Sequence, residues 1–212
     1  IYLSTQYGQI QGVRGIPNLG WGFNGPSQLL MDAYEAGDPR KAATVIADGE
    51  TIEGKKIKAD AAAYKFFNKK VYVSLAERAL YGRSTDIQAY WLNIRLIRYA
   101  DVLLMHAEAA CEVGNTTEAL DKLEMVRNRA RNGNSNVLPK ITTTNKEELR
   151  AKIHQERRIE LALEWERFYD LVRWDEAKAV IPNFVSGKHE LFPIPQIEID
   201  NSDGLINQNL GY

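Results

Sequence analysis

Cysteine, long apolar runs and basic runs are scarce or missing in this chain, and each scarcity excludes a kind of structure or partner. A single cysteine, Cys111, excludes an internal disulfide. The apolar runs are interrupted by charged residues and fall short of the roughly 20 residues that a membrane-spanning helix needs. The 27 Lys and Arg residues balance 28 Asp and Glu residues without a basic run, so bulk charge does not recruit nucleic acid. We therefore expect a globular chain that does not itself cross a membrane.

Motifs for catalysis, metal binding and nucleotide binding are also missing. His106, His154 and His189 stand too far apart for a local metal site, and none belongs to an HxxxH or HExxH motif. The glycines form neither GxGxxG nor GxxxxGK, and no GxSxG marks a nucleophile. We predict no metal, no cofactor, no catalytic residue and therefore no enzymatic activity.

The first 92 residues are predicted to be a loop-rich region that carries the ligand site. Residues 1–25 hold six glycines and little periodicity, which predicts an irregular surface. Residues 26–36, PSQLLMDAYEA, predict a short helix that starts behind a proline. The runs ATVIADG, TIEGKKIKA and KKVYVSLAE predict short β strands, some of them paired as a small ribbon.

Residues 93–181 are predicted to form helical pairs. Apolar residues recur at spacings of three and four from Leu96 to Cys111, and Gly114 ends that run. Thr116 or Thr117 is expected to cap a second helix that reaches about Arg131. A third helix over about 146–165 and a fourth over about 167–179 form a second pair, and residues 182–212 are expected to be an extended segment packing on the helices. The predicted fold class is mainly α, with tetratricopeptide-like helical pairs (an α-α superhelix) and an irregular region carrying short β strands.

The carboxylates of the third helix suggest two functions. Glu156, Glu160 and Glu164 share one helical face, as the paired acids of a hydrolase could. The third and fourth predicted helices form a hairpin that also holds several arginines. Their guanidinium groups would keep these carboxylates ionised, which favours an ion-pair scaffold over catalysis. Asp101 and Glu108 are interpreted in the same way, with Arg98 or later arginines as partners. The arginines of the hairpin are Arg157, Arg158, Arg167 and Arg173.

A first aromatic cluster, Trp21, Phe23 and Asn24 in GWGFNGP, is predicted to bind ligand. The glycines let the backbone approach a ligand, and flat rings beside an amide suit the apolar face and the hydroxyls of a sugar. The alternative is that the Trp21 and Phe23 rings are buried and pack the loop against the helices, because large aromatic residues are mostly buried.

A second aromatic cluster brackets the string RSTDIQA. Tyr81 and Trp91 are its candidate ligand-binding residues, accompanied by Arg83 and Tyr90, and the same alternative of core packing applies. Core packing is the expectation for the two tryptophans of the ionic hairpin, Trp165 and Trp174.

Six separate strings stand out along the chain: GWGFNGPSQLLMDAYEAGDPR, RYADVLLMHAEA, ALDKLEMVRNRA, ERRIELALEWERFYDLVRW, FPIPQIEID and QNLGY. Together, and in this order, they resemble the C-terminal half of SusD/RagB-family proteins of Bacteroidetes. Trp165 stands where that family often has glycine, and Leu210 where proline is usual.

The resemblance implies binding rather than catalysis. Such proteins are outer-membrane lipoproteins at the cell surface that capture glycans, or peptides in some members, and deliver them to a TonB-dependent SusC-like transporter. The family's N-terminal half, with its lipid anchor, is expected to lie outside this chain. The family has no fixed motif for ligand residues, so the five candidates rest on the chain's own pattern. The alternative function is a tetratricopeptide-like scaffold that binds peptides or proteins.

Overall fold

The structure is a computed structural model that describes residues 6–61, 64–80 and 92–212. The chain divides into two compact units, Ile1–Glu164 and Trp165–Tyr212, which are described separately below. The mainly helical fold with a few short strands is confirmed. The division of the chain at residues 92 and 181 stays a prediction.

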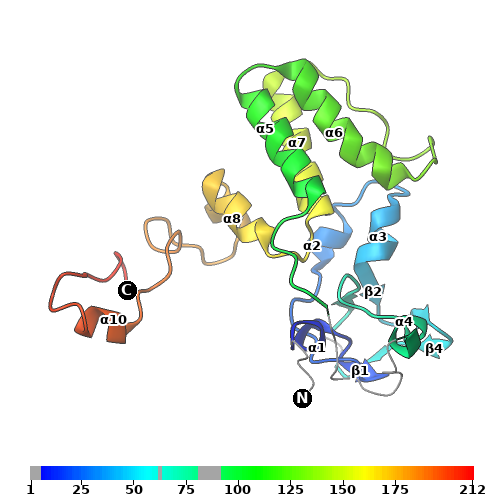
Figure 1. The fold of residues 1–212 in the computed structure, drawn as a ribbon, viewed down its shortest axis with the longest axis horizontal. Helices are drawn as coiled ribbons and strands as arrows, with labels where there is room; N and C mark the ends of the chain where they lie inside the picture. The colour runs from blue at the N-terminus through cyan, green and yellow to red at the C-terminus, as the bar shows by residue number, and fades with distance from the viewer. Residues whose placement is uncertain (1–5, 62–63, 81–91) are drawn as a thin grey trace. The chain divides into compact units, whose positions relative to one another are not determined.

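Three helices build the larger core of the first unit, and they lie side by side in Figure 1. They are α5 Tyr99–Glu112, α6 Thr116–Arg131 and α7 Lys146–Glu160. Helix α5 packs against both α6 and α7. Leu104, Ala107, Leu123, Leu149 and Ile153 are buried between them, at the three- and four-residue spacings that place apolar residues on one helical face. The pair formed by α5 and α6 agrees with the tetratricopeptide-like prediction.

The ends of these helices differ from the prediction in three places. Asn115, and neither Thr116 nor Thr117, caps α6, because its side-chain oxygen accepts a hydrogen bond from the Glu118 amide. Leu96 is 79% exposed because it precedes α5 rather than belonging to it. Helix α7 ends at Glu160, earlier than expected, because the backbone turns there and Leu163 reaches a φ of 65°.

The first unit also contains a second core and a set of short elements. Val13, Ile46, Ile57 and Phe67 are almost fully buried in this core. The elements are α1 Tyr7–Gln11, β1 Gly15–Ile16, α2 Gln28–Met31, α3 Pro39–Thr44, β2 Val45–Ala47, β3 Thr51–Ile52, β4 Lys55–Lys56, β5 Lys58–Ala59, β6 Phe66–Asn68 and α4 Leu75–Leu80. Strands β1 and β5, β2 and β6, and β3 and β4 pair antiparallel. The expected ribbon is thus present as β3 and β4.

Local predictions for this region were partly wrong. The string KKVYVSLAE forms no strand; β6 lies just before it, and α4 begins within it. The helix predicted over 26–36 shortens to α2, and the unpredicted α3 follows with Asp38 as its N-cap. Val13, in the segment expected to be a surface, belongs to the core because its side chain packs with residues more than thirty positions away.

The second unit holds α8 Glu166–Arg173, α9 Ala177–Val180 and α10 Gln196–Asp200, joined by turns. The Phe168 ring contacts the rings of Tyr169 and Phe192. Trp165 is 53% exposed with a left-handed φ of 77°, so its predicted place in the core is wrong. Trp174 is half-buried, and the Arg173 guanidinium lies 4.7 Å from the centre of its ring. The second helical pair stays a prediction, because α7 and α8 belong to different units.

Candidate functional site

The loop of residues 20–24 is held against α1 by its backbone. Hydrogen bonds of 2.9 to 3.0 Å run from the amides of Trp21, Gly22 and Phe23 to carbonyl oxygens of the α1 region. The approach is so close that a Cβ atom on Gly20 would lie 2.2 Å from the carbonyl oxygen of Gln9. Glycine is therefore required here, and it gives the aromatic loop a defined position.

The two rings of this loop face outward. Trp21 is 45% exposed and Phe23 is 63% exposed, which contradicts the alternative that both plug the loop against the helices. Gly22 has a φ of 78°, and a Cβ there would meet Arg14 and Tyr64. The Arg14 guanidinium lies 5.4 Å from the centre of the Tyr64 ring. Arg14 and Tyr64 thus lie against the loop at Gly22, and neither was predicted as part of it.

Asn24 anchors the loop to the turn that follows α7. Its side-chain nitrogen donates to the Gln11 side-chain oxygen at 2.7 Å and to the Leu163 carbonyl at 3.1 Å. Asn24 adopts a left-handed φ of 52°, which asparagine tolerates better than most residues. The side-chain nitrogen is therefore used structurally, and a direct contact of Asn24 with ligand stays a prediction.

Gln11 connects this loop to the neighbouring strand. The side chain is fully buried, and its oxygen also accepts a hydrogen bond from the Asn68 side chain at 2.9 Å. The Gln11 side-chain nitrogen donates to the Tyr7 carbonyl at 3.1 Å. Buried amides are stable only when they are paired in this way. Nothing in the local sequence distinguishes Gln11 from a surface glutamine.

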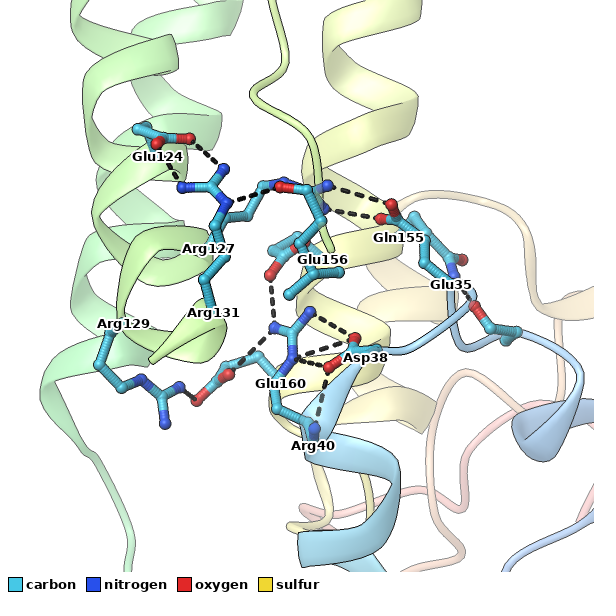
Figure 2. A network of polar contacts seen from close by, with 12 residues as sticks. Glu35, Asp38, Arg40, Glu124, Arg127, Arg129, Arg131, Gln155, Glu156 and Glu160 are labelled. Atoms are coloured by element: carbon cyan, nitrogen blue, oxygen red, sulfur yellow. Dashed lines mark hydrogen bonds and ion pairs between the residues drawn. The ribbon is translucent and has the colours of Figure 1, made fainter. Parts of the chain in front are cut away.

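The α7 carboxylates Glu156 and Glu160 belong to a buried ion-pair network, and Figure 2 shows part of it. Arg40 in α3 donates to Asp38 at 2.8 Å and also to Glu156 and Glu160. Arg127 in α6 donates to Glu156 at 2.8 Å. The network therefore ties α3 and α6 to the same face of α7.

The partners of Glu160, at the end of α7, and of Glu164, just beyond it, come mostly from outside the helical hairpin. Glu160 accepts from Arg98 at 2.8 Å and pairs with Arg129, while Glu164 pairs with Arg98 and with Lys70. The predicted ion-pair scaffold is thus present, with partners for these carboxylates that the sequence analysis had not assigned to them.

Two of the hairpin arginines have other contacts. Arg157 pairs with Asp101 at 2.8 Å, which confirms the expectation that a later arginine holds that carboxylate. Arg158 donates to the Leu29 carbonyl.

The protonation of this network is unfavourable for acid catalysis. Burial alone would raise the pKa of Glu160, but Arg98, Arg129 and Arg40 outweigh it and hold that pKa below its ordinary value. The pKa of Glu164 is lowered for the same reason, through Arg98 and Lys70. Carboxylates held in the ionised form do not donate protons, so the arrangement favours a scaffold over a hydrolase site.

The second aromatic cluster, with Tyr81 and Trp91, lies outside the described residues. Within residues 6–61, 64–80 and 92–212, no group of three or more His, Cys, Asp or Glu side chains is placed to hold a metal ion. In the same ranges, none of the helices combines the length and the apolar character that crossing a bilayer requires.

Comparisons with known proteins agree with one another. A family model described as the SusD family matches residues 4–182. SusD-like protein P2 of Formosa agariphila is 29% identical, over 99% of this chain and 46% of its own length.

Two solved structures are also similar. A SusD-like protein of Bacteroides fragilis has a TM-score of 0.74 at 24% identity, over 100% of this chain and 53% of its own. A laminarin-binding SusD-like protein has a TM-score of 0.69 at 32% identity, over 96% of this chain and 41% of its own. The chain thus spans about half the length of these proteins or less.

Proposed function

Because the chain belongs to the SusD family, we propose that it captures an oligosaccharide at the bacterial cell surface and delivers it to a TonB-dependent SusC-like transporter. The observation that carries the proposal is the outward orientation of Trp21 and Phe23 on a loop whose backbone is held in place. Sugar rings stack on flat aromatic faces, and a loop that is already ordered loses little entropy on binding.

The similar structure described as a laminarin-binding SusD-like protein supports the ligand class. Arg14 and Tyr64 lie against the loop at Gly22, and the Arg14 side chain is 49% exposed although it also pairs with Asp60 at 2.6 Å. Stacking faces flanked by polar groups are the usual composition of a saccharide site. Tyr81 and Trp91 complete the proposed set of ligand residues.

Delivery to a transporter and a lipid anchor at the outer membrane are proposed from the family alone. The alternative, a scaffold for peptides or proteins, is favoured by one feature, the helical pair of α5 and α6. Its exposed face carries Tyr99, Val102 and Met105, which a helical peptide could cover.

Calorimetric titration of the full chain separates these functions. We expect β-glucan oligosaccharides of the laminarin type, or another neutral plant or host glycan in the panel, to bind with a saturable heat. We expect unstructured and amphipathic peptides to bind no more than weakly. A matched pair of variants locates the site: Trp21→Ala should lose glycan binding, whereas Tyr99→Ala, an exposed aromatic on α5, should retain it. Saturable binding of peptides but of no glycan would overturn the proposal.

A further inference from the structure

A cavity of about 250 Å³ in the first unit opens beside the ion-pair network. Five cationic and two acidic side chains line it: Arg40, Lys70, Arg95, Arg98, Arg129, Glu160 and Glu164. The volume is smaller than that of most ligand pockets and suits a small group. An excess of positive charge in a partly enclosed space attracts anions more strongly than the same charge in open water.

The two acidic side chains of the cavity already form ion pairs with cations. Glu160 pairs with Arg40, Arg98 and Arg129, and Glu164 pairs with Arg98 and Lys70. Neither carboxylate is therefore left to neutralise the remaining cation of the lining, Arg95.

Arg95 and Arg129 keep unused hydrogen-bond donors. Among the contacts of the described residues, Arg95 donates from one nitrogen to the Lys70 carbonyl at 3.1 Å, and Arg129 donates from one nitrogen to Glu160. A guanidinium group has five N–H donors, so each retains several. The Arg129 side chain is 59% exposed, which leaves the donors accessible from solvent.

The other cations of the lining have fewer donors to offer. The Arg98 guanidinium donates to both carboxylates and to the Glu160 carbonyl at 2.6 Å. Arg40 is held by Asp38, Glu156 and Glu160. The charges of these two side chains are already paired with carboxylates, while Arg95 and Arg129 are placed to make new hydrogen bonds.

Lys70 is a cation of the lining that burial disfavours. Burial lowers the pKa of its ammonium group, and the nearby charge of Glu164 does not restore it. The Arg98 charge adds to the lowering. A further anion in the cavity would favour the charged form of Lys70 and would be favoured by it.

We propose that this cavity binds a small oxyanion, a sulfate or a carboxylate group, with Arg95 and Arg129 as its hydrogen-bond donors. Guanidinium groups bind planar carboxylates and tetrahedral oxyanions through two parallel hydrogen bonds. The site is separate from the Trp21 and Phe23 surface and does not depend on the proposed function. A free inorganic anion and an acidic sugar carry the same group, and the test distinguishes them.

Titration calorimetry of the full chain with sodium sulfate, sodium glucuronate and glucose tests this, with chloride added to hold ionic strength constant. We expect sulfate or glucuronate to bind in the millimolar range or tighter, and glucose not to bind at this site. Arg95→Gln and Arg129→Gln should each weaken the anion's binding by about tenfold or more, since each removes charge-assisted hydrogen bonds. Tighter binding of glucuronate than of sulfate indicates an acidic sugar as the source, and the reverse order indicates a free inorganic anion.

Arg150→Gln is the matched control, because Arg150 is a surface arginine of α7 that pairs with Glu112 outside the cavity. It should leave anion affinity unchanged. Thermal melts of all three variants without anion check that each is folded. The proposal is overturned if neither sulfate nor glucuronate binds the parent chain. Equal anion affinity in the parent, Arg95→Gln and Arg129→Gln would overturn it as well.

Discussion

Arg40 and Glu156 lie 116 residues apart in the sequence and form an ion pair that joins α3 to α7. Their side chains are 8% and 3% exposed, so both charges are removed from water. Each has a second opposite partner, Asp38 for Arg40 and Arg127 for Glu156. Such a network is stable only while every buried charge keeps a partner.

Glu156→Ala should therefore destabilise the chain by about 3 kcal/mol or more, because it leaves Arg40 and Arg127 buried with one partner fewer. Glu160→Ala should have a similar effect through Arg98 and Arg40. Urea denaturation followed by circular dichroism measures the change in the free energy of unfolding.

Arg158→Ala is the control on the same helix. Arg158 donates a hydrogen bond to the Leu29 carbonyl near the surface, so the expected loss is under about 1 kcal/mol. Equal, small losses for Glu156→Ala and Arg158→Ala would contradict the structural role of the network and reopen the catalytic alternative.

Stability should fall as the pH is lowered below about 4.5. The pKa values of Glu160 and Glu164 lie below their ordinary value of 4.5 in the folded chain, so between these values the unfolded chain binds more protons. Their stabilisation is present above pH 4.5 and is lost as the pH falls through the folded pKa values. Melting temperatures between pH 7 and 3 check this, and a Glu160→Gln variant should show a shallower decline than the parent.

Trp21→Ala should weaken glycan binding by about 1 to 3 kcal/mol and leave the melting temperature nearly unchanged, because the ring is 45% exposed. Titration calorimetry and thermal melts on the same samples separate the two effects. Phe23→Ala should likewise weaken glycan binding and leave the melting temperature nearly unchanged. A loss of about 3 kcal/mol or more of stability in Trp21→Ala would instead mean that the ring supports the fold.

Gln11→Leu should destabilise the chain by about 1 to 3 kcal/mol, because it removes the oxygen that accepts from Asn24 and Asn68. It should also weaken glycan binding, since Asn24 anchors the aromatic loop. Gln28→Leu is the control, because Gln28 makes an exposed hydrogen bond to Asp32 in α2. If the two leucine variants were equally stable and bound glycan equally, the anchoring role of Gln11 would be wrong.

Leu123→Ala should cost about 2 to 5 kcal/mol of stability, because Leu123 is 1% exposed in the core of α5, α6 and α7. Met125→Ala, at a position two residues later that is 44% exposed, should cost under about 1 kcal/mol. Chemical denaturation of both variants measures whether the helical core is where the structure places it.

The helical core could be predicted from the sequence because its signal is local. Leu103, Leu104, Ala107 and Cys111 recur at helical spacing, and all four are buried as expected. The short strands were harder to predict from the sequence. Strand β6 was missed because Phe67 is buried by pairing with Ile46 in β2, a partner that no local pattern reveals.

The charged face of α7 was likewise predicted only in part. The spacing of Glu156, Glu160 and Glu164 placed them on one face, and the surrounding arginines indicated ion pairs. The sequence did not identify Arg40 and Arg127 as partners of Glu156, since they come from α3 and α6 rather than from the hairpin. Any arginine within reach satisfies a carboxylate, so the pairing depends on which helices the fold brings together.

The sequence by itself determined the helices of the core, the aromatic loop and the family, because periodicity, glycine content and the order of motifs are all properties of the chain. Only the tertiary structure decided that Trp21 and Phe23 face outward, that Gln11 is a buried anchor, and that Arg95 and Arg129 meet at a cavity. Exposure and charge pairing are set by contacts between segments that are distant in the sequence. These contacts depend on how the hydrophobic cores pack, which no single stretch of residues determines.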